Sequence, residues 1–206
     1  MNIIEAENIS VVFDSYGDII KAVDHVDFIL PKGQTIGIVG ESGSGKSTFA
    51  RVLSGLQIPS SGEVKFMGSP IWNGNKIYEG ALRKEVQMVF QDPYGSLNPR
   101  MRLVKAVAEA IRHHQGLDKK SSTLAAFDLL ESMGISNLDA QKFPSKLSGG
   151  QRQRASVARA LSAQPSVLIA DEPTSAIDQS AQAQLLGLFN DLIKNGLSIV
   201  LVSHDL

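Results

Sequence analysis

The eight residues GESGSGKS, at positions 40–47, combine glycines, a lysine and hydroxyl side chains in a spacing suited to binding phosphate groups. They fit the pattern G-x-x-x-x-G-K-S/T and stand between an apolar run ending at Val39 and a helical pattern beginning at Lys46. Glycines let successive backbone N–H groups turn toward an anion, and a helix N-terminus adds partial positive charge. We expect Lys46 to bridge the β- and γ-phosphates of a nucleotide and the Ser47 hydroxyl to ligate Mg²⁺. The residues expected to bind the nucleotide here are Gly40, Ser42, Gly43, Ser44, Gly45, Lys46, Ser47 and Thr48.

Two adjacent acids, Asp171 and Glu172, follow the apolar run 167–170. Ligands of open α/β sheets bind at the carboxyl ends of the strands, which is where a buried strand would deliver these side chains. We expect Asp171 to hold the water shell of Mg²⁺ and Glu172 to face the γ-phosphate as general base or polariser of the attacking water. Adjacent acids can also form a solvated turn or a helix cap, but the loop around Lys46 favours the catalytic interpretation.

The segment LSGGQ, at positions 147–151, predicts a second anion site. Ser148 is a natural N-cap, and Gly149 and Gly150 expose the first N–H groups of the helix that follows. An ordinary capped helix would explain Ser148 alone. It would not explain the glycine pair, since glycine in a helix costs up to about 1 kcal/mol relative to alanine.

The hydrophobic pattern alternates between strand-like and helical segments along the chain. Because the later strands are almost uninterrupted apolar runs, we expect a parallel sheet covered on both faces, with a helical insertion that suggests two lobes. The expected strands are 2–13, 23–30, 34–40, 62–68, 86–91, 166–172 and 198–205, and the expected helices are 46–55, 104–114, 122–134, about 147–163 and 180–196.

The composition excludes several classes of protein. The chain carries 20 Lys and Arg against 21 Asp and Glu, and a net charge of -1 gives no electrostatic reason to expect nucleic acid as a partner. The absence of cysteine excludes disulfides and thiolate metal sites. The N-terminus MNIIEAENIS lacks the features of a secretory signal, and no segment reaches the roughly 18 apolar residues of a membrane span. We therefore expect a soluble, cytoplasmic protein.

Together, GESGSGKS, LSGGQ and VLIADE resemble the motifs of the ATP-binding cassette (ABC) ATPase family, and the resemblance covers nearly the whole chain. It implies an α/β P-loop NTPase fold with a parallel core sheet, an N-terminal antiparallel β subdomain and a helical insertion subdomain. Residues 1–206 would form one nucleotide-binding domain, with a RecA-like core and β subdomain in 1–95 and 165–206 and a helical subdomain in 96–164 ending in the signature helix. The implied cofactors are ATP and Mg²⁺.

Four further residues gain roles from this resemblance alone. Gln91 is similar to the Q-loop glutamine, which touches Mg²⁺ and the attacking water, and His204 to the switch histidine at the γ-phosphate. Asp178 resembles the D-loop acid. Tyr16 resembles the aromatic residue that stacks on adenine, although Phe13 is close enough to compete.

In the family, the LSGGQ of one subunit closes over the γ-phosphate bound by the other subunit's loop. The resemblance thus implies that Ser148, Gly149, Gly150 and Gln151 bind nucleotide across a dimer with two ATP molecules in its interface. It leaves open whether the second ATPase subunit is identical or related.

The segment QDPYGSLNPRM, starting at Gln91, resembles the Q-loop extension of the peptide and nickel importer branch. That branch implies an energy-coupling ATPase on the inner face of the cell membrane, working with separate permease subunits to import di- or oligopeptides or Ni²⁺. An ordinary irregular loop is the alternative for this segment. The residues that would contact a coupling helix of the permease are Asp92, Pro93, Tyr94, Leu97 and Pro99.

Two other functions remain for comparison. A soluble accessory ATPase of a non-transport pathway, as in phosphonate degradation, resembles the same branch. A DNA- or ribosome-associated ATPase is disfavoured by the near-neutral composition and by the lack of a long coiled-coil insertion. The sequence ends two residues past His204, where family members usually continue, so the resemblance implies a domain truncated after the switch histidine with weak intrinsic ATPase activity.

Overall fold

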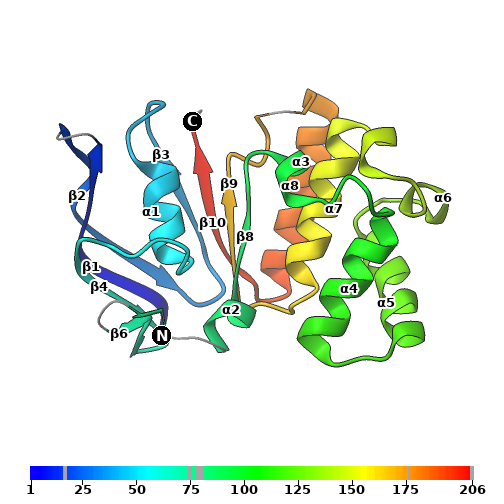
Figure 1. The fold of residues 1–206 in the computed structure, drawn as a ribbon, viewed down its shortest axis with the longest axis horizontal. Helices are drawn as coiled ribbons and strands as arrows, with labels where there is room; N and C mark the ends of the chain where they lie inside the picture. Colours follow the sequence, from blue (N-terminus) through cyan, green and yellow to red (C-terminus); the bar gives the residue numbers. More distant parts are fainter. Residues whose placement is uncertain (16–17, 74–75, 78–80, 176, 205–206) are drawn as a thin grey trace. The chain divides into compact units, whose positions relative to one another are not determined.

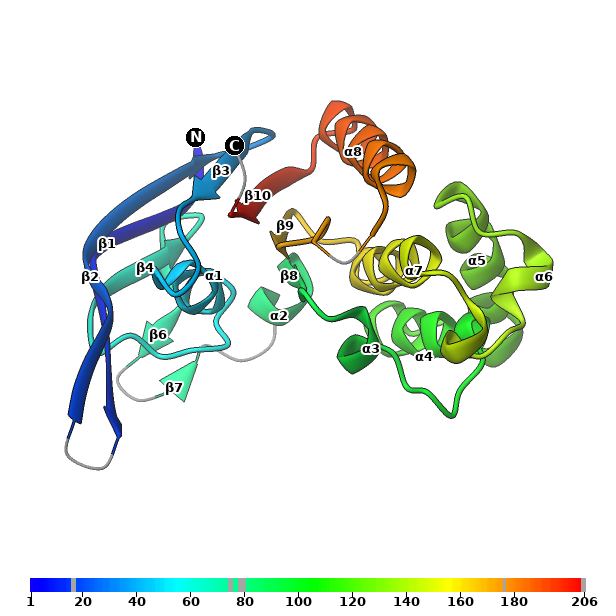
Figure 2. The ribbon, with the colours of Figure 1, turned by 90° about the horizontal axis from the view of Figure 1, so that it is seen from above.

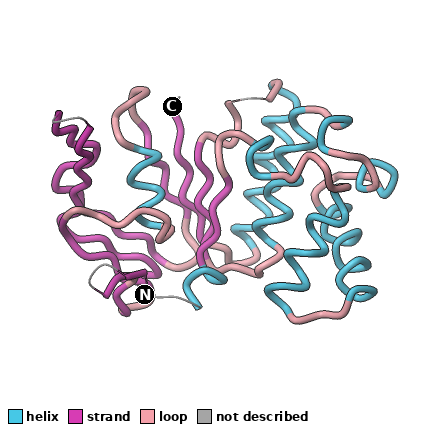
Figure 3. The backbone as a smooth tube through the Cα atoms, viewed as in Figure 1, coloured by secondary structure: helices cyan, strands magenta, loops and turns pink. Residues whose placement is uncertain are grey.

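The computed structural model describes residues 1–15, 18–73, 76–77, 81–175 and 177–204. The chain divides into two compact units. The first consists of Met1–Met88, Ser166–Glu172 and Ile193–Leu206, and the second of Val89–Pro165 and Pro173–Leu192. Strands gather in the first unit and most of the helices in the second (Figure 3).

A parallel sheet forms one layer of the first unit. Its strand order is β3 (Thr35–Val39), β10 (Ser198–Ser203), β9 (Val167–Asp171) and β8 (Val86–Val89), and β10 runs parallel to both β3 and β9 (Figure 1). Every residue of β9 is buried, as its uninterrupted apolar sequence predicts. In the register of the sheet, Ser203 lies beside Val39 and Val202 beside Asp171. The chain segments that follow these strands therefore leave the sheet at one edge.

An antiparallel sheet forms a second layer of the same unit, in the order β2 (Asp18–Pro31), β1 (Asn2–Ser15), β4 (Ser61–Phe66) and β5 (Ser69–Pro70). Helix α1 (Lys46–Leu53) contacts strands of both sheets and lies between them in Figure 2. Its buried face includes Phe49, whose ring meets that of Phe28 edge to face at a centroid distance of 5.8 Å. The remaining elements of the unit are the short strands β6 (Trp72–Asn73) and β7 (Lys76–Ile77) and helix α2 (Ala81–Glu85).

The second unit is helical. It contains α3 (Pro93–Ser96), α4 (Leu103–Gln115), α5 (Lys119–Ser132), α6 (Asn137–Ala140), a 3₁₀ turn at Pro144–Lys146, α7 (Gly149–Leu161) and most of α8 (Gln179–Lys194). Helix α4 packs on both α5 and α7. On α4, Leu103, Val107 and Ile111 share one apolar face and are buried, as their helical spacing predicts.

The two sheets and the helical segment agree with the fold class expected from the sequence. Helix α5 begins earlier than its apolar pattern indicates, because Asp118 caps it by accepting hydrogen bonds from the backbone N–H groups of Lys120 and Ser121. In the part of the chain that the structure describes, no helix combines the length and the apolar character needed to cross a lipid bilayer.

Candidate functional site

The loop at 40–45 joins β3 to α1 and is shaped by its glycines. Gly45, the N-cap of α1, has a φ of 91°, and a Cβ at this position would lie 1.9 Å from the carbonyl oxygen of Ala22. Gly43 also has a positive φ, of 81°. Only glycine fits at position 45, because both the left-handed conformation and the close backbone exclude a side chain.

The side chain of Lys46 folds back onto this loop and bonds to its backbone. Its Nζ donates hydrogen bonds to the carbonyl oxygens of Gly40 and Glu41, both at 2.7 Å, and the residue is buried. The ammonium group is thus held over the turn of the loop. Ser42, Gly43 and Ser44 remain exposed around it. A cation ringed by accessible backbone suits a bound polyphosphate.

Ser47 and Asp171 meet although they are far apart in the sequence. The Ser47 hydroxyl donates to Asp171 Oδ1 at 2.9 Å, and Asp171 is 3% exposed. Burial raises the pKa of the Asp171 carboxyl above its ordinary value, while the hydrogen bond from Ser47 acts in the opposite direction. Thr48, the next residue of α1, is half-buried.

These two oxygen-bearing side chains fit Mg²⁺, which prefers oxygen ligands and commonly shares its shell with phosphates and water. Across the described ranges, no group of three or more His, Cys, Asp or Glu side chains could hold a metal ion by itself. An ion at Ser47 and Asp171 would therefore take its other ligands from the nucleotide and from water.

Glu172 points in a different direction from Asp171. Its Oε2 lies 3.4 Å from Nδ1 of His204, which follows β10. The backbone of Glu172 has a φ of 44°, and its N–H donates to the carbonyl oxygen of Val202 at 3.0 Å. A left-handed conformation costs a non-glycine residue about 1–3 kcal/mol and is characteristic of functional sites. The sheet edge thus holds two acids with separate partners.

The adenine-stacking aromatic residue and Gln91 are also expected to contact the nucleotide. Tyr16 lies outside the described residues, and Phe13 is 40% exposed on β1. Gln91 is exposed and belongs to the second unit, two residues after β8. The structure therefore brings together the loop around Lys46, Ser47, Asp171, Glu172 and His204 within the first unit.

The signature segment lies in the second unit, where Ser148 caps α7. The Ser148 hydroxyl oxygen accepts a hydrogen bond from the Gln151 backbone N–H at 3.2 Å, and Gln151 Oε1 accepts one from the Ser148 N–H at 2.9 Å. This is a capping box. Ser148 is exposed, Gly149 half-buried and Gly150 buried. The N-terminus of α7 is therefore open to an anion on the Ser148 side.

Close packing requires a glycine at position 150, which the sequence did not reveal. A Cβ at this position would lie 2.7 Å from the Cβ of Ala181 in α8. The second glycine of the signature thus permits α7 and α8 to pack closely, in addition to any part in exposing N–H groups. Asp178, the expected D-loop acid, lies just before α8, and its Oδ1 accepts a hydrogen bond from the N–H of Ala181 at 2.9 Å.

Two further hydrogen bonds join polar side chains of the signature helix to other segments, and Asp139, the partner in one of them, was not singled out from the sequence. Asp139 accepts a hydrogen bond from Gln151 Nε2 at 2.9 Å, and Arg154 Nη1 donates to Gln184 Oε1 at 2.9 Å. The spacing of twelve residues between Asp139 and Gln151 has no periodic meaning, so only the folded chain discloses the pair.

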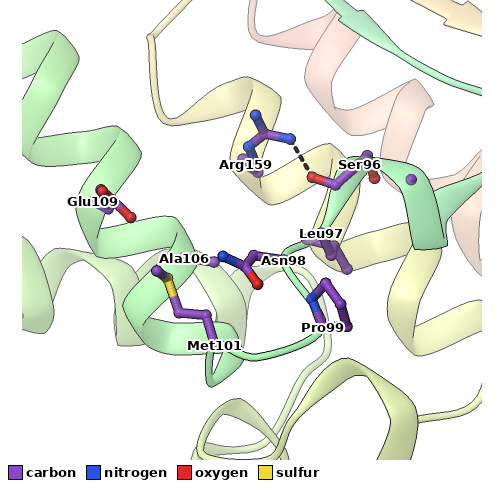
Figure 4. Close-up of a pocket in the computed structure, with 9 residues that line it drawn as sticks. Ser96, Leu97, Asn98, Pro99, Met101, Ala106, Glu109 and Arg159 are labelled. Carbon is purple, nitrogen blue, oxygen red and sulfur yellow. Dashed lines mark hydrogen bonds between the residues drawn. The ribbon is translucent and has the colours of Figure 1, made fainter.

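A groove of about 530 Å³ opens beside the segment that follows Gln91 (Figure 4). Leu97 and Pro99, two of the expected permease contacts, line it, and Arg159 of α7 donates a hydrogen bond to the carbonyl oxygen of Ser96 at its wall. Pro93 is buried and Asp92 exposed. The lining residues are Gly95, Ser96, Leu97, Asn98, Pro99, Met101, Ala106, Glu109 and Arg159.

Comparison with known proteins places this geometry in a family. Residues 23–175 match the family described as ABC transporter. The chain belongs to the ABC transporter family. This confirms the resemblance drawn from the phosphate loop, the signature and the acidic strand end.

The most similar relatives include three bacterial proteins named for peptide transport. The chain is 45% identical to a probable peptide ABC transporter ATP-binding protein, y4tS, of Sinorhizobium fredii, over 91% of this chain and 54% of that protein. It is 43% identical to the di/tripeptide transport ATP-binding protein DppF of Pseudomonas aeruginosa (91% and 58%) and 44% identical to the oligopeptide transport ATP-binding protein OppF of Bacillus subtilis (91% and 62%). The chain therefore spans little more than half the length of these relatives.

Solved structures of ABC cassettes share the fold. A dimeric, post-hydrolysis structure of the cassette MJ0796 bound to ADP and Pi is similar with a TM-score of 0.87 and 29% identity, over 98% of this chain and 88% of that one. The cassette cbiO1 of Clostridium perfringens gives a TM-score of 0.82 and 27% identity, over 99% and 79%. The expected P-loop fold, with its parallel core and antiparallel β sheets, is confirmed.

Proposed function

We propose that this protein binds and hydrolyses ATP as the energy-coupling subunit of an importer for di- or oligopeptides. The observation that carries the ATPase proposal is the meeting of Ser47 with Asp171 at 2.9 Å beside the loop closed by Lys46. A hydroxyl, a buried carboxylate and an ammonium group at one sheet edge are the parts that phosphoryl transfer to water requires.

Each residue of this edge then has a role. Lys46 and the loop N–H groups hold the β- and γ-phosphates, and Ser47 and Asp171 hold Mg²⁺ with help from Gln91. Bound Mg²⁺ neutralises the charge that develops on the phosphate oxygens. Glu172 accepts the proton of the attacking water or polarises it, and His204 contacts the γ-phosphate from beside Glu172. Tyr16 or Phe13 stacks on the adenine.

The signature segment completes the site from a second ATPase subunit. Ser148, Gly149, Gly150 and Gln151 of one copy close over the γ-phosphate held by the other, with Asp178 at the same interface. This pairing is supported by the open N-cap of α7 and by the solved cassettes that are named as dimers. ATP favours the closed pair because both halves contact its γ-phosphate, and hydrolysis removes that link.

Coupling to transport is proposed to run through the groove beside Leu97 and Pro99. An apolar-edged groove next to the Q-loop suits a short helix of an integral membrane permease, which would hold this subunit at the inner face of the membrane. Peptides are favoured over Ni²⁺, and import over a phosphonate-type accessory role, because the relatives named above are peptide transport proteins.

The test is transport by a reconstituted complex. The full chain would be co-expressed with the permease and solute-binding proteins of its proposed transport system, purified together with them and placed in proteoliposomes. We expect ATP-dependent uptake of a labelled dipeptide and none of ⁶³Ni²⁺, with uptake abolished by Lys46→Ala. Failure of the chain to co-purify with the permease, or uptake without ATP, would contradict the proposal.

A further inference from the structure

Asp139, in the short helix α6, is tied to the signature segment through one side chain. Its Oδ2 accepts a hydrogen bond from Gln151 Nε2 at 2.9 Å, while Gln151 Oε1 accepts one from the backbone N–H of Ser148 at 2.9 Å. The amide of Gln151 therefore bridges Asp139 and Ser148, with its nitrogen end toward the first and its oxygen end toward the second.

The carboxylate of Asp139 is itself held on two sides. Lys142 Nζ donates to Oδ1 at 2.6 Å, and the Ser136 hydroxyl donates to Oδ2 at 3.0 Å. The hydrogen bonds from Lys142 and Ser136 are the largest causes that hold the pKa of Asp139 below its ordinary value, and Gln151 adds to them. The group is consequently an anion that only accepts hydrogen bonds.

An acceptor-only partner decides which way a glutamine amide faces. The two ends of a glutamine amide have nearly the same shape, but only the nitrogen end can donate. Asp139 requires that end, so the oxygen end faces the Ser148 N–H and completes the capping box. With the amide reversed, two N–H donors would oppose each other at Ser148, and the cap would loosen.

The hydrogen bonds of this cap determine whether the Ser148 hydroxyl can donate to an anion. The Ser148 oxygen accepts from the Gln151 N–H at 3.2 Å, which leaves the hydroxyl hydrogen able to donate. Ser148 is exposed, whereas the Asp139 side chain is only 22% exposed and lies behind Gln151 in this chain of hydrogen bonds.

We propose that Asp139 is a positioning residue for the signature segment: it fixes the amide of Gln151 so that the Ser148 hydroxyl and N-cap stay in the orientation that receives a γ-phosphate. This inference rests on the proposed function, in which Ser148 contacts nucleotide held by a second subunit. Asp139 itself touches no nucleotide.

Two substitutions separate the role of the acceptor from that of the charge. Asp139→Ala removes both. Asp139→Asn keeps one oxygen, which can accept from Ser136 and Gln151 while its nitrogen takes the place of Oδ1. Asp118→Ala is the matched control: Asp118 is likewise an acid of the helical unit whose pKa is lowered by hydrogen bonds, but it is the N-cap of α5, and its bonds stay within the first turn of that helix.

The first measurement is ATP-dependent dimerisation of the full chain, by sedimentation, in a Glu172→Gln background that slows hydrolysis. We expect Asp139→Ala to weaken dimerisation about fivefold or more, the loss typical of an N-cap, and to leave binding of a fluorescent ATP analogue to the monomer unchanged. Asp139→Asn should stay within about twofold of the parent, and Asp118→Ala should dimerise like the parent. Equal dimerisation of Asp139→Ala and the parent, or equal losses in Asp139→Ala and Asp118→Ala, would overturn the inference.

A second measurement does not depend on the proposed function. Amide hydrogen exchange at Ser148 and Gln151 should accelerate in Asp139→Ala and not in Asp118→Ala; unchanged exchange would also overturn the inference. Ser148→Arg serves to separate the two proposals, because it should block ATP-dependent dimerisation outright. If Ser148→Arg still dimerises with ATP, the proposed nucleotide contact is wrong. If it blocks dimerisation while Asp139→Ala does not weaken it, only the inference about Asp139 is wrong.

Discussion

Glu172 and His204 face each other at the ends of two neighbouring parallel strands, with Glu172 Oε2 3.4 Å from His204 Nδ1. The pairing follows from the sheet: β9 and β10 are in register, and Glu172 is further fixed by its backbone bond to Val202. The left-handed φ of 44° at Glu172 turns this residue away from Asp171, which turns toward Ser47. One strand end thus supplies two carboxylates with separate partners, Ser47 for Asp171 and His204 for Glu172.

Lys46→Ala is expected to weaken nucleotide binding by about a hundredfold or more, because a phosphate would lose a charge-assisted partner in a closed loop. Isothermal calorimetry with ATP and Mg²⁺ measures this directly. Lys32→Ala, which removes an exposed lysine from the same unit, is the control and should bind like the parent. If the Lys46→Ala variant binds ATP with undiminished affinity, Lys46 does not contact the nucleotide.

Gly45→Ala should destabilise the protein far more than Gly43→Ala. At Gly45 a Cβ would lie 1.9 Å from a backbone oxygen, whereas at Gly43 no atom lies within 4 Å and only the positive φ opposes a side chain. We expect losses in the free energy of unfolding of about 3 kcal/mol or more and about 1 kcal/mol, respectively, in urea titrations. Equal losses would show that the close approach to Ala22 is not maintained.

Gly150→Ala should be rescued by a second substitution in α8. The new Cβ would lie 2.7 Å from the Cβ of Ala181, and we expect this clash to cost about 1–3 kcal/mol of folding stability. Ala181→Gly removes the opposing methyl group, so the double variant should recover part of the loss beyond the sum of the single effects. Strictly additive effects in thermal or urea unfolding would contradict the packing role of Gly150.

Asp171 is expected to make the stability of the nucleotide-free protein depend on pH. Burial raises the pKa of its carboxyl above the ordinary value of 3.8, so the folded state holds this proton more tightly than the unfolded state. Stability from this group is therefore greatest below the ordinary value and falls as pH rises through the raised pKa. Asp171→Asn keeps an oxygen for Ser47 and should lack this fall.

Urea unfolding of the parent and of Asp171→Asn, in buffers with a metal chelator from about pH 4 to about pH 8, tests this expectation. The difference in unfolding free energy should shift in favour of the variant as pH rises. A difference that stays constant over the whole range would mean that Asp171 ionises as freely in the folded protein as in the unfolded chain.

The sequence predicts those parts of the fold that are set by neighbouring residues, such as apolar runs, helix caps and loop glycines. The apolar runs ending at Val39 and Ala170 correspond to β3 and β9, and Ser148 before a helical pattern corresponds to the start of α7. Local chemistry sufficed there, because strand burial and N-capping depend on neighbouring residues. The same holds for the glycines of the loop before Lys46, whose spacing reflects a backbone requirement.

Features that depend on distant contacts could not be predicted. The closeness of Gly150 to Ala181, the bridge from Asp139 through Gln151 to Ser148, and the left-handed turn at Glu172 all arise from how elements pack. The short helix α3 was also expected only as part of a loop, because Pro, Gly and Ser predict irregular backbone when they are considered alone.

In the proposed dimer, ATP is held between the loop around Lys46 of one subunit and Ser148 of another. The chain has no cysteine, so Glu41→Cys, at an exposed position of the loop, and Ser145→Cys, at an exposed position three residues before Ser148, can be introduced into the Glu172→Gln variant without background labelling. Glu172→Gln should keep ATP bound because it removes the proton acceptor, which slows hydrolysis by about a hundredfold or more and retains the dimer.

A short bis-maleimide crosslinker, applied with and without ATP and Mg²⁺, then reports the distance between the two positions across the dimer. We expect an intermolecular crosslink between the two introduced thiols that appears only with ATP and disappears in the Lys46→Ala background. A dimer that forms with ATP but gives no such crosslink, or a crosslink that forms equally well without ATP, would contradict the proposed position of ATP between Lys46 and Ser148.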